Sequence, residues 1–175
     1  MIVGNIKSSF LHFLLISQVS ENVTAFFGGS VNNFGVVTYD WSIMNYTSYP
    51  IQLLSPRVGS GCVLIKDKSG LPKVAIVGGS SKGMEFWNPA DGTVESVNEQ
   101  IPPEEGATMG MEYPSILPIK DGEEFLVYGG FKGSIHKGIW KYTVADNSWI
   151  RVGSTLIPKA EHVALAVSGI DCSVF

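Results

Sequence analysis

Three stretches, TAFFGG (residues 24–29), VAIVGG (74–79) and FLVYGG (125–130), each end a short apolar run with two glycines. Counted from the first glycine of each pair, the intervals are 50 residues (28 to 78) and 51 residues (78 to 129). A period of this size is typical of proteins built from repeated structural units. Glycine suits a strand that ends at positive φ or whose backbone lies close to a neighbour. The repeat glycines are Gly28, Gly29, Gly78, Gly79, Gly129 and Gly130.

Each glycine pair is followed by the same order of segments. A polar loop leads into an apolar strand with an aromatic residue, then a turn, then a further strand. In the third unit the aromatic residues of these two strands are Tyr142 and Trp149, seven residues apart. The corresponding positions are Tyr39 and Tyr46 in the first unit, and Trp87 and Val94 in the second. We expect the aromatic residues to pack between adjacent units.

A proline followed by a basic residue marks the connections between units. Pro56-Arg57 and Pro158-Lys159 each precede a short apolar strand, whereas residues 101–119 keep the proline and the strand but lack the basic residue. Each unit therefore has four predicted strands, and the second of them ends in the glycine pair.

Four short antiparallel strands in about fifty residues describe one blade of a β-propeller. The glycine pair, the aromatic residues that follow it and the proline-basic segment together resemble the kelch repeat over about residues 23–167. The resemblance implies an all-β fold, namely a partial β-propeller of about three four-stranded antiparallel kelch-like blades.

The predicted blades cover residues 21–56, 57–107 and 108–158, and residues 159–175 are predicted to supply the first strand of an incomplete fourth blade. Closed propellers have roughly four to eight blades. We therefore expect the chain to be a fragment or isoform of a longer propeller, or to self-associate and so complete the ring.

Two interpretations of residues 1–20 stay open. Lys7 followed by the apolar stretch at 10–19 has the character of a secretory signal peptide. Alternatively, residues 10–17 form the first strand of blade one and pair with residues 23–27. The first interpretation predicts a secreted protein, which the sequons at Asn22 and Asn45 would allow, and the second is compatible with a cytoplasmic one.

Composition excludes several classes of partner. The net charge is −4 and no run of Lys or Arg occurs, so we expect no nucleic-acid partner. No apolar run approaches the roughly 20 residues that a membrane helix needs, so we expect no membrane span. The two cysteines, Cys62 and Cys172, allow one disulfide at most.

Catalytic and metal-binding patterns are not found in the sequence. The three histidines, His12, His136 and His162, lie in different units without a ligand partner at metal-binding spacing. We therefore predict that the chain is not an enzyme and needs no cofactor or metal. The alternative is a fragment of a secreted carbohydrate-active or oxidase propeller whose catalytic residues are absent from this chain.

The remaining prediction is a protein interaction module that binds through loops on one face. The loops after the glycine pairs differ in length and chemistry, as recognition loops on a constant scaffold do. Their basic character favours a protein or peptide partner, including an acidic one, or a glycan. The candidate contact residues are Asn32, Asn33, Lys82, Lys132, His136 and Lys137, with Arg57 and Lys159 as second choices.

Overall fold

The computed structural model describes residues 14–28, 35–50, 52–55, 57–79, 83–97, 111–131 and 133–157. Within these ranges the chain forms twelve β-strands and no α-helix. The first sheet contains β1 (Leu14–Gln18), β2 (Val23–Gly28), β3 (Val36–Asp40) and β4 (Asn45–Tyr49). The second contains β5 (Ser60–Lys66), β6 (Pro72–Gly78), β7 (Met84–Trp87) and β8 (Val94–Val97). The third contains β9 (Ser115–Ile119), β10 (Glu124–Tyr128), β11 (Gly138–Thr143) and β12 (Ser148–Ser154), with the 3-10 turn η2 (Lys120–Gly122) after β9.

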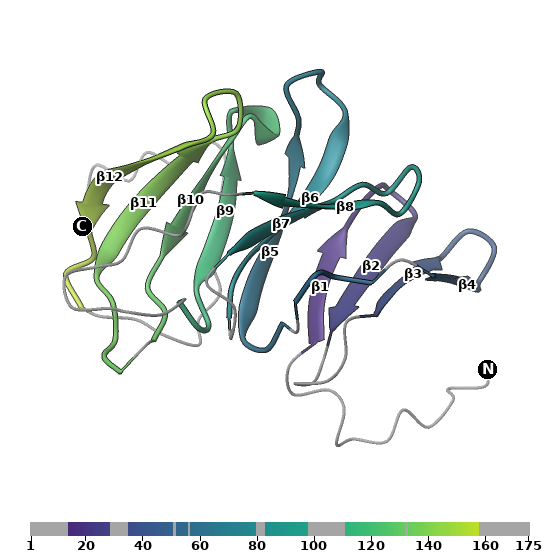
Figure 1. Cartoon of the computed structure of the whole chain (residues 1–175), viewed down its shortest axis with the longest axis horizontal. Coiled ribbons are helices and arrows are strands. Elements are labelled where there is room, and N and C mark those ends of the chain that lie inside the picture. Colours follow the sequence, from purple (N-terminus) through teal and green to yellow (C-terminus); the bar gives the residue numbers. More distant parts are fainter. Residues whose placement is uncertain are drawn as a thin grey trace.

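Each sheet is an antiparallel meander in which every strand pairs with the next one along the chain. The prediction of an all-β protein with three four-stranded antiparallel sheets is therefore confirmed. The sheets stand side by side in chain order and do not close into a ring (Figure 1).

The first strands of the three sheets lie at the centre of this arrangement. β5 contacts both β1 and β9, whereas β4 and β12 lie at opposite ends of the molecule (Figure 1). Propeller blades are arranged in this way, with first strands near a common axis and last strands at the rim. The fold is consistent with a partial β-propeller.

The middle sheet is buried on both faces, and this explains the continuous apolar run of β6. Val74 and Ile76 pack against the first sheet, whereas Ala75 and Val77 pack against the third. Successive residues of a strand point to opposite faces, so one strand contributes to two cores. Full burial of each Val or Ile side chain contributes about 1.5–3 kcal/mol.

Aromatic residues join neighbouring sheets, as predicted, in the second and third units, whereas Tyr39, Trp41 and Tyr46 of the first sheet do not contact another sheet in the described structure. Phe27 of the first sheet meets Trp87 of the second edge to face, with ring centroids 5.3 Å apart. Phe86 of the second sheet meets Tyr142 of the third edge to face at 6.3 Å. Such contacts add about 0.5–1.5 kcal/mol beyond the burial of apolar area. Trp41 is exposed on the outer side of the first sheet.

Residues 14–18 form the strand of the second interpretation above. β1 pairs with β2 from Leu14 opposite Gly28 to Gln18 opposite Thr24. The amide of Val19 closes the turn by donating to the carbonyl of Val23. Residues 1–13, the predicted strand in 159–175, and Cys172 lie outside the described residues.

Candidate binding face

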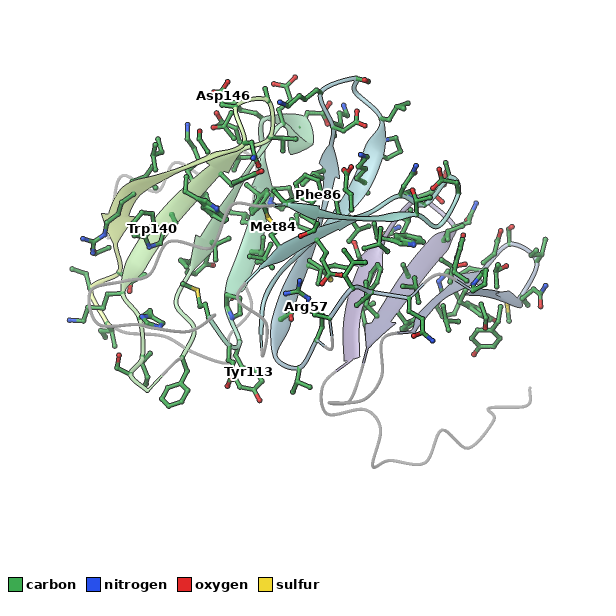
Figure 2. All side chains as sticks on the ribbon, viewed as in Figure 1. Arg57, Met84, Phe86, Tyr113, Trp140 and Asp146 are labelled. Atoms are coloured by element: carbon green, nitrogen blue, oxygen red, sulfur yellow. The ribbon has the colours of Figure 1, made fainter. Side chains whose placement is uncertain are left out.

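The strand order gives the molecule two ends, which we name by the connections found there. The hairpin face carries the turns at 19–22, 41–44, 67–71, 88–93, 120–123 and 144–147. At the opposite end, β2, β6 and β10 finish in their glycine pairs, and we name this end the glycine-loop face. Figure 2 shows Tyr113 at the glycine-loop face and Asp146 at the hairpin face. The loops that sequence analysis selected all start from the glycine-loop face.

The glycines of the pairs have backbone conformations that other residues rarely adopt. The φ angles are 65° at Gly28, 74° at Gly78, 79° at Gly79, 67° at Gly129 and 91° at Gly130. Gly29 lies outside the described residues. Left-handed backbone of this kind costs an L-residue roughly 1–2 kcal/mol.

Close approach of another chain segment is the second reason for glycine. A Cβ at Gly79 would lie 2.5 Å from the carbonyl oxygen of Val58. At Gly130 it would lie 2.9 Å from the carbonyl oxygen of Glu112. The amide of Gly79 also donates to the carbonyl of Met111 at 2.7 Å, and this bond ties the second sheet to the connection that enters the third. Gly79 and Gly130 thus allow the segments between the sheets to lie directly against the backbone of the glycine pairs.

Arg57 lies inside the second unit, with a side chain that is 1% exposed (Figure 2). Its Nε and Nη2 donate to Oε1 of Glu85 at 3.1 and 2.5 Å. Its Nη1 donates to the carbonyls of Gly78 at 2.9 Å and Gly83 at 2.7 Å. These two carbonyls flank the loop between β6 and β7, so the guanidinium group fastens the two ends of that loop together.

Glu85 receives further hydrogen bonds from the segment that carries Arg57. The amide of Leu54 donates to Oε2 at 2.9 Å and the hydroxyl of Ser55 donates to Oε1 at 2.5 Å. A buried charge is tolerated when it is paired and its other oxygens are bonded, as here. Arg57 therefore bonds to residues at both ends of the loop from within and is not presented to solvent, unlike the contact residue that the sequence suggested.

The connection from β10 to β11 contains two predicted contact residues that differ in exposure. His136 is buried and its amide donates to the carbonyl of Gly130 at 2.9 Å. Lys137 is exposed, and its carbonyl accepts from the amide of Thr155 at 2.8 Å. Lys137 is thus a predicted contact residue that the structure leaves at the surface. The other candidates, Asn32, Asn33, Lys82, Lys132 and Lys159, lie outside the described residues.

Exposed apolar residues accompany Lys137, and sequence analysis did not select them. Phe131 and Ile135 form a short antiparallel bridge and are 41% and 48% exposed. Leu156 and Ile157 follow Thr155 and are also exposed. Phe131 and Ile135 belong to the stretch FKGSIHKG at 131–138, from which the sequence-based prediction took only polar residues.

A charged cleft of about 410 Å³ lies between the second and third sheets, near the hairpin face. Lys73 lies in this cleft, 2.5 Å from Glu95 and 3.6 Å from Asp67. Burial lowers the pKa of Lys73, but the hydrogen bond to Glu95 and the two acidic neighbours raise it more. The positive charge of Lys73 is therefore balanced by the carboxylates of Asp67 and Glu95. The cleft needs residues from two sheets, so no single stretch of sequence indicated it.

Among the residues of the described ranges, no group of three or more His, Cys, Asp or Glu side chains is placed to hold a metal ion. No helix in the same ranges is long and apolar enough to cross a membrane. Comparison with known protein families gives no matching family model, and no curated protein matches the sequence.

Proposed function

We propose that the chain is a non-catalytic, kelch-type interaction module that binds a partner through loops on its glycine-loop face. One observation carries this proposal. Three sheets of the same topology each end their second strand in a left-handed glycine on the same face, yet the loops that follow differ. A constant scaffold with variable loops on one face is suited to recognition.

The kelch relationship is part of the proposal, and the contacts in the second unit support it. Arg57 of the proline-basic segment is bonded to Gly78 of the glycine pair and to Glu85 at the start of the next strand. Two residues on which the resemblance rests in this unit, Arg57 and Gly78, thus contact each other directly, and this contact supports the proposal.

The partner that we propose is a protein or peptide with an acidic character, and a glycan is the second possibility. Lys137 is exposed at the glycine-loop face. Lys82 and Lys132 belong to the corresponding loops in sequence. Phe131 and Ile135 beside Lys137 would add apolar contact, which isolated charges at a surface do not provide.

We place the protein outside the cell, with a cytoplasmic location as the alternative. Asn22 and Asn45 of the two sequons are both exposed, so a glycosyltransferase could reach them in the folded chain. Cleavage of a signal peptide within residues 19–25 would, however, remove β1, and cleavage after residue 22 would also remove Asn22. Amino-terminal sequencing of the protein purified from secreting cells would decide whether β1 is retained.

The binding proposal is tested by charge reversal on the two faces. The variant Lys82→Glu/Lys132→Glu/Lys137→Glu changes lysines of the sequence segments that follow Gly79 and Gly130, and Lys68→Glu changes an exposed lysine in a hairpin turn. Each protein is used to probe arrays of acidic peptides and of glycans. We expect the triple variant to lose any specific binding of the wild-type chain, while Lys68→Glu retains it. Equal loss in both variants, or binding that neither affects, would contradict the proposal.

A further inference from the structure

We propose that the uncovered face of the first sheet binds the third sheet of a second copy of this chain, so that two copies form a closed ring of six blades. This inference concerns the ends of the row of sheets. It stands on the packing between sheets and is independent of what the loops bind.

Position relative to the glycine pair decides which way a side chain of the second strand points. One and three residues before the first glycine, Ala75 and Val77 of β6 point toward the following sheet. Two and four residues before it, Val74 and Ile76 point toward the preceding sheet. We call these the forward and backward faces of a sheet. β2 and β10 obey the same rule, because Phe27 points forward and Val127 points backward.

The first sheet has a backward face with no sheet against it in the described structure. Phe26 lies on this face, with Ile16 paired directly opposite it on β1. Tyr39 is paired with Thr24 on one side and Tyr46 on the other, so all three lie on the same face. Ile16 is 57% and Tyr46 is 62% exposed.

The aromatic pair on this face repeats a pair that is covered elsewhere in the molecule. The rings of Tyr39 and Tyr46 have centroids 4.6 Å apart. Their equivalents on the third sheet, Tyr142 and Trp149, are 4.9 Å apart and belong to the core between the second and third sheets. Phe86 on the forward face of the second sheet meets Tyr142. The backward face of the first sheet therefore resembles the backward face of the third sheet, which is covered by the forward face of the second sheet.

The same chain also carries a forward face that no described sheet covers. On the third sheet, Leu126 and Tyr128 hold the forward positions. Leu117 and Lys141 are paired on either side of Leu126, and Ile150 is paired with Lys141. Ile150 is 49% exposed. Lys141 is paired with Glu124 at 3.1 Å, so this cation brings no unpaired charge into a contact.

A second copy of the chain can cover both the backward face of the first sheet and the forward face of the third sheet. Each copy supplies one forward and one backward face, so two identical contacts related by a twofold axis satisfy all four uncovered faces. Two copies of three sheets make six blades, within the range of about four to eight at which propellers close. Closure would cover the apolar faces at both ends of the row, and large uncovered apolar faces are rare on monomers.

The test is the mass of the full-length protein in solution, measured by light scattering after size exclusion. We expect about twice the chain mass of 18.9 kDa. Ile16→Lys on the backward face and Ile150→Lys on the forward face should each weaken the dimer at least about tenfold, because a lysine would be buried at the contact. Leu71→Lys, which changes a 60% exposed residue in a hairpin turn, should leave the dimer intact. Circular dichroism of every variant checks that the fold is retained.

A monomer at the highest soluble concentration would overturn the inference. Open polymers would overturn the closed ring. A dimer that folded Ile16→Lys and Ile150→Lys both leave unchanged would show that another surface joins the copies.

Discussion

Arg57 is the residue whose environment differs most from its sequence-based prediction. A basic residue after a proline in a loop-rich segment suggested a surface contact. Its acceptors Gly83 and Glu85 lie more than twenty residues further along the chain, and only folding brings them next to Arg57. Sequence spacing identifies the segment but cannot show that its charge is paired inside the sheet.

Arg57→Ala should destabilise the fold by about 3–5 kcal/mol, because it leaves the carboxylate of Glu85 buried without its cation. Urea unfolding followed by tryptophan fluorescence would measure the change. Arg151→Ala is the matched control, since Arg151 is exposed and donates to Ser154, and should change stability by less than about 0.5 kcal/mol. A cost below about 1 kcal/mol for Arg57→Ala would show that the pair contributes little.

Alanine substitutions at three glycines distinguish the effect of positive φ from the effect of close backbone contact. Gly79→Ala should cost about 2–4 kcal/mol, because it combines positive φ with a close contact to the backbone of Val58. Gly133→Ala keeps the positive φ but meets open space, so it should cost about 1–2 kcal/mol. Gly83→Ala has neither feature and should be nearly neutral. The midpoints of thermal unfolding should follow this order, and an equal effect at all three positions would contradict the close approach beneath Gly79.

At the scale of single elements, the sequence was most informative where a strand has a chemical marker. The glycine pair correctly predicted the ends of β2, β6 and β10. Residues seven apart across a turn do lie opposite one another, as in the pairs Tyr142–Trp149 and Tyr39–Tyr46. β1 has no such marker, and its apolar residues fit a signal peptide as well as a strand. The charged cleft and the forward and backward faces depend on how sheets meet, which local sequence does not encode.

The accessibility of Cys62 tests the presence of β1. Its Sγ lies 3.3 Å from the carbonyl oxygen of Ile16, and burial raises the pKa of the thiol to about 12. In a Cys172→Ser background, we expect an aromatic disulfide reagent at pH 8 to react at least about tenfold more slowly than with a free thiol. Removal of residues 1–18 should restore fast reaction. Fast reaction in the full chain would mean that β1 does not cover this cysteine.

Glu124, which follows the turn between β9 and β10, should make the protein less stable at acidic pH. The hydrogen bond from Lys120 lowers the pKa of Glu124 below its ordinary value of 4.5; burial opposes this effect, and Lys141 reinforces it. Stabilisation from a lowered pKa is complete above the unfolded value and is lost as pH falls through the folded one. We expect the urea concentration at the unfolding midpoint to decrease as the pH is lowered below about 4.5. The decrease should be smaller in Glu124→Gln, which has no carboxylate at this position.

Glu21→Gln changes an exposed carboxylate in another hairpin turn and serves as the control. It should retain the pH dependence of the wild-type chain. If Glu124→Gln and Glu21→Gln lost stability in parallel with the wild type as pH fell, the lysine contacts of Glu124 would not contribute to acid sensitivity.

In the whole molecule the three sheets are arranged like blades, with their first strands close together and their last strands spread apart (Figure 1). The period of the glycine pairs predicted the number of sheets and their internal order. The second strands of all three sheets end at one face, from which the variable loops start, and this supports the proposed binding role. The two uncovered end faces follow from this arrangement, because among the three described sheets only the middle one has a neighbour on each side.

Electron paramagnetic resonance distances between spin labels test this arrangement most directly. In a Cys62→Ser/Cys172→Ser background, label pairs are placed near the hairpin face on the first strands (Gln18 with Lys66, and Lys66 with Pro118) and on the last strands (Asn45 with Glu95, and Glu95 with Ser148). Dilution with unlabelled protein keeps each distance within one chain. We predict that both distances between last strands exceed the corresponding distances between first strands. Equal distances, or closer last strands, would show that the sheets do not radiate from a common axis and would contradict the propeller arrangement.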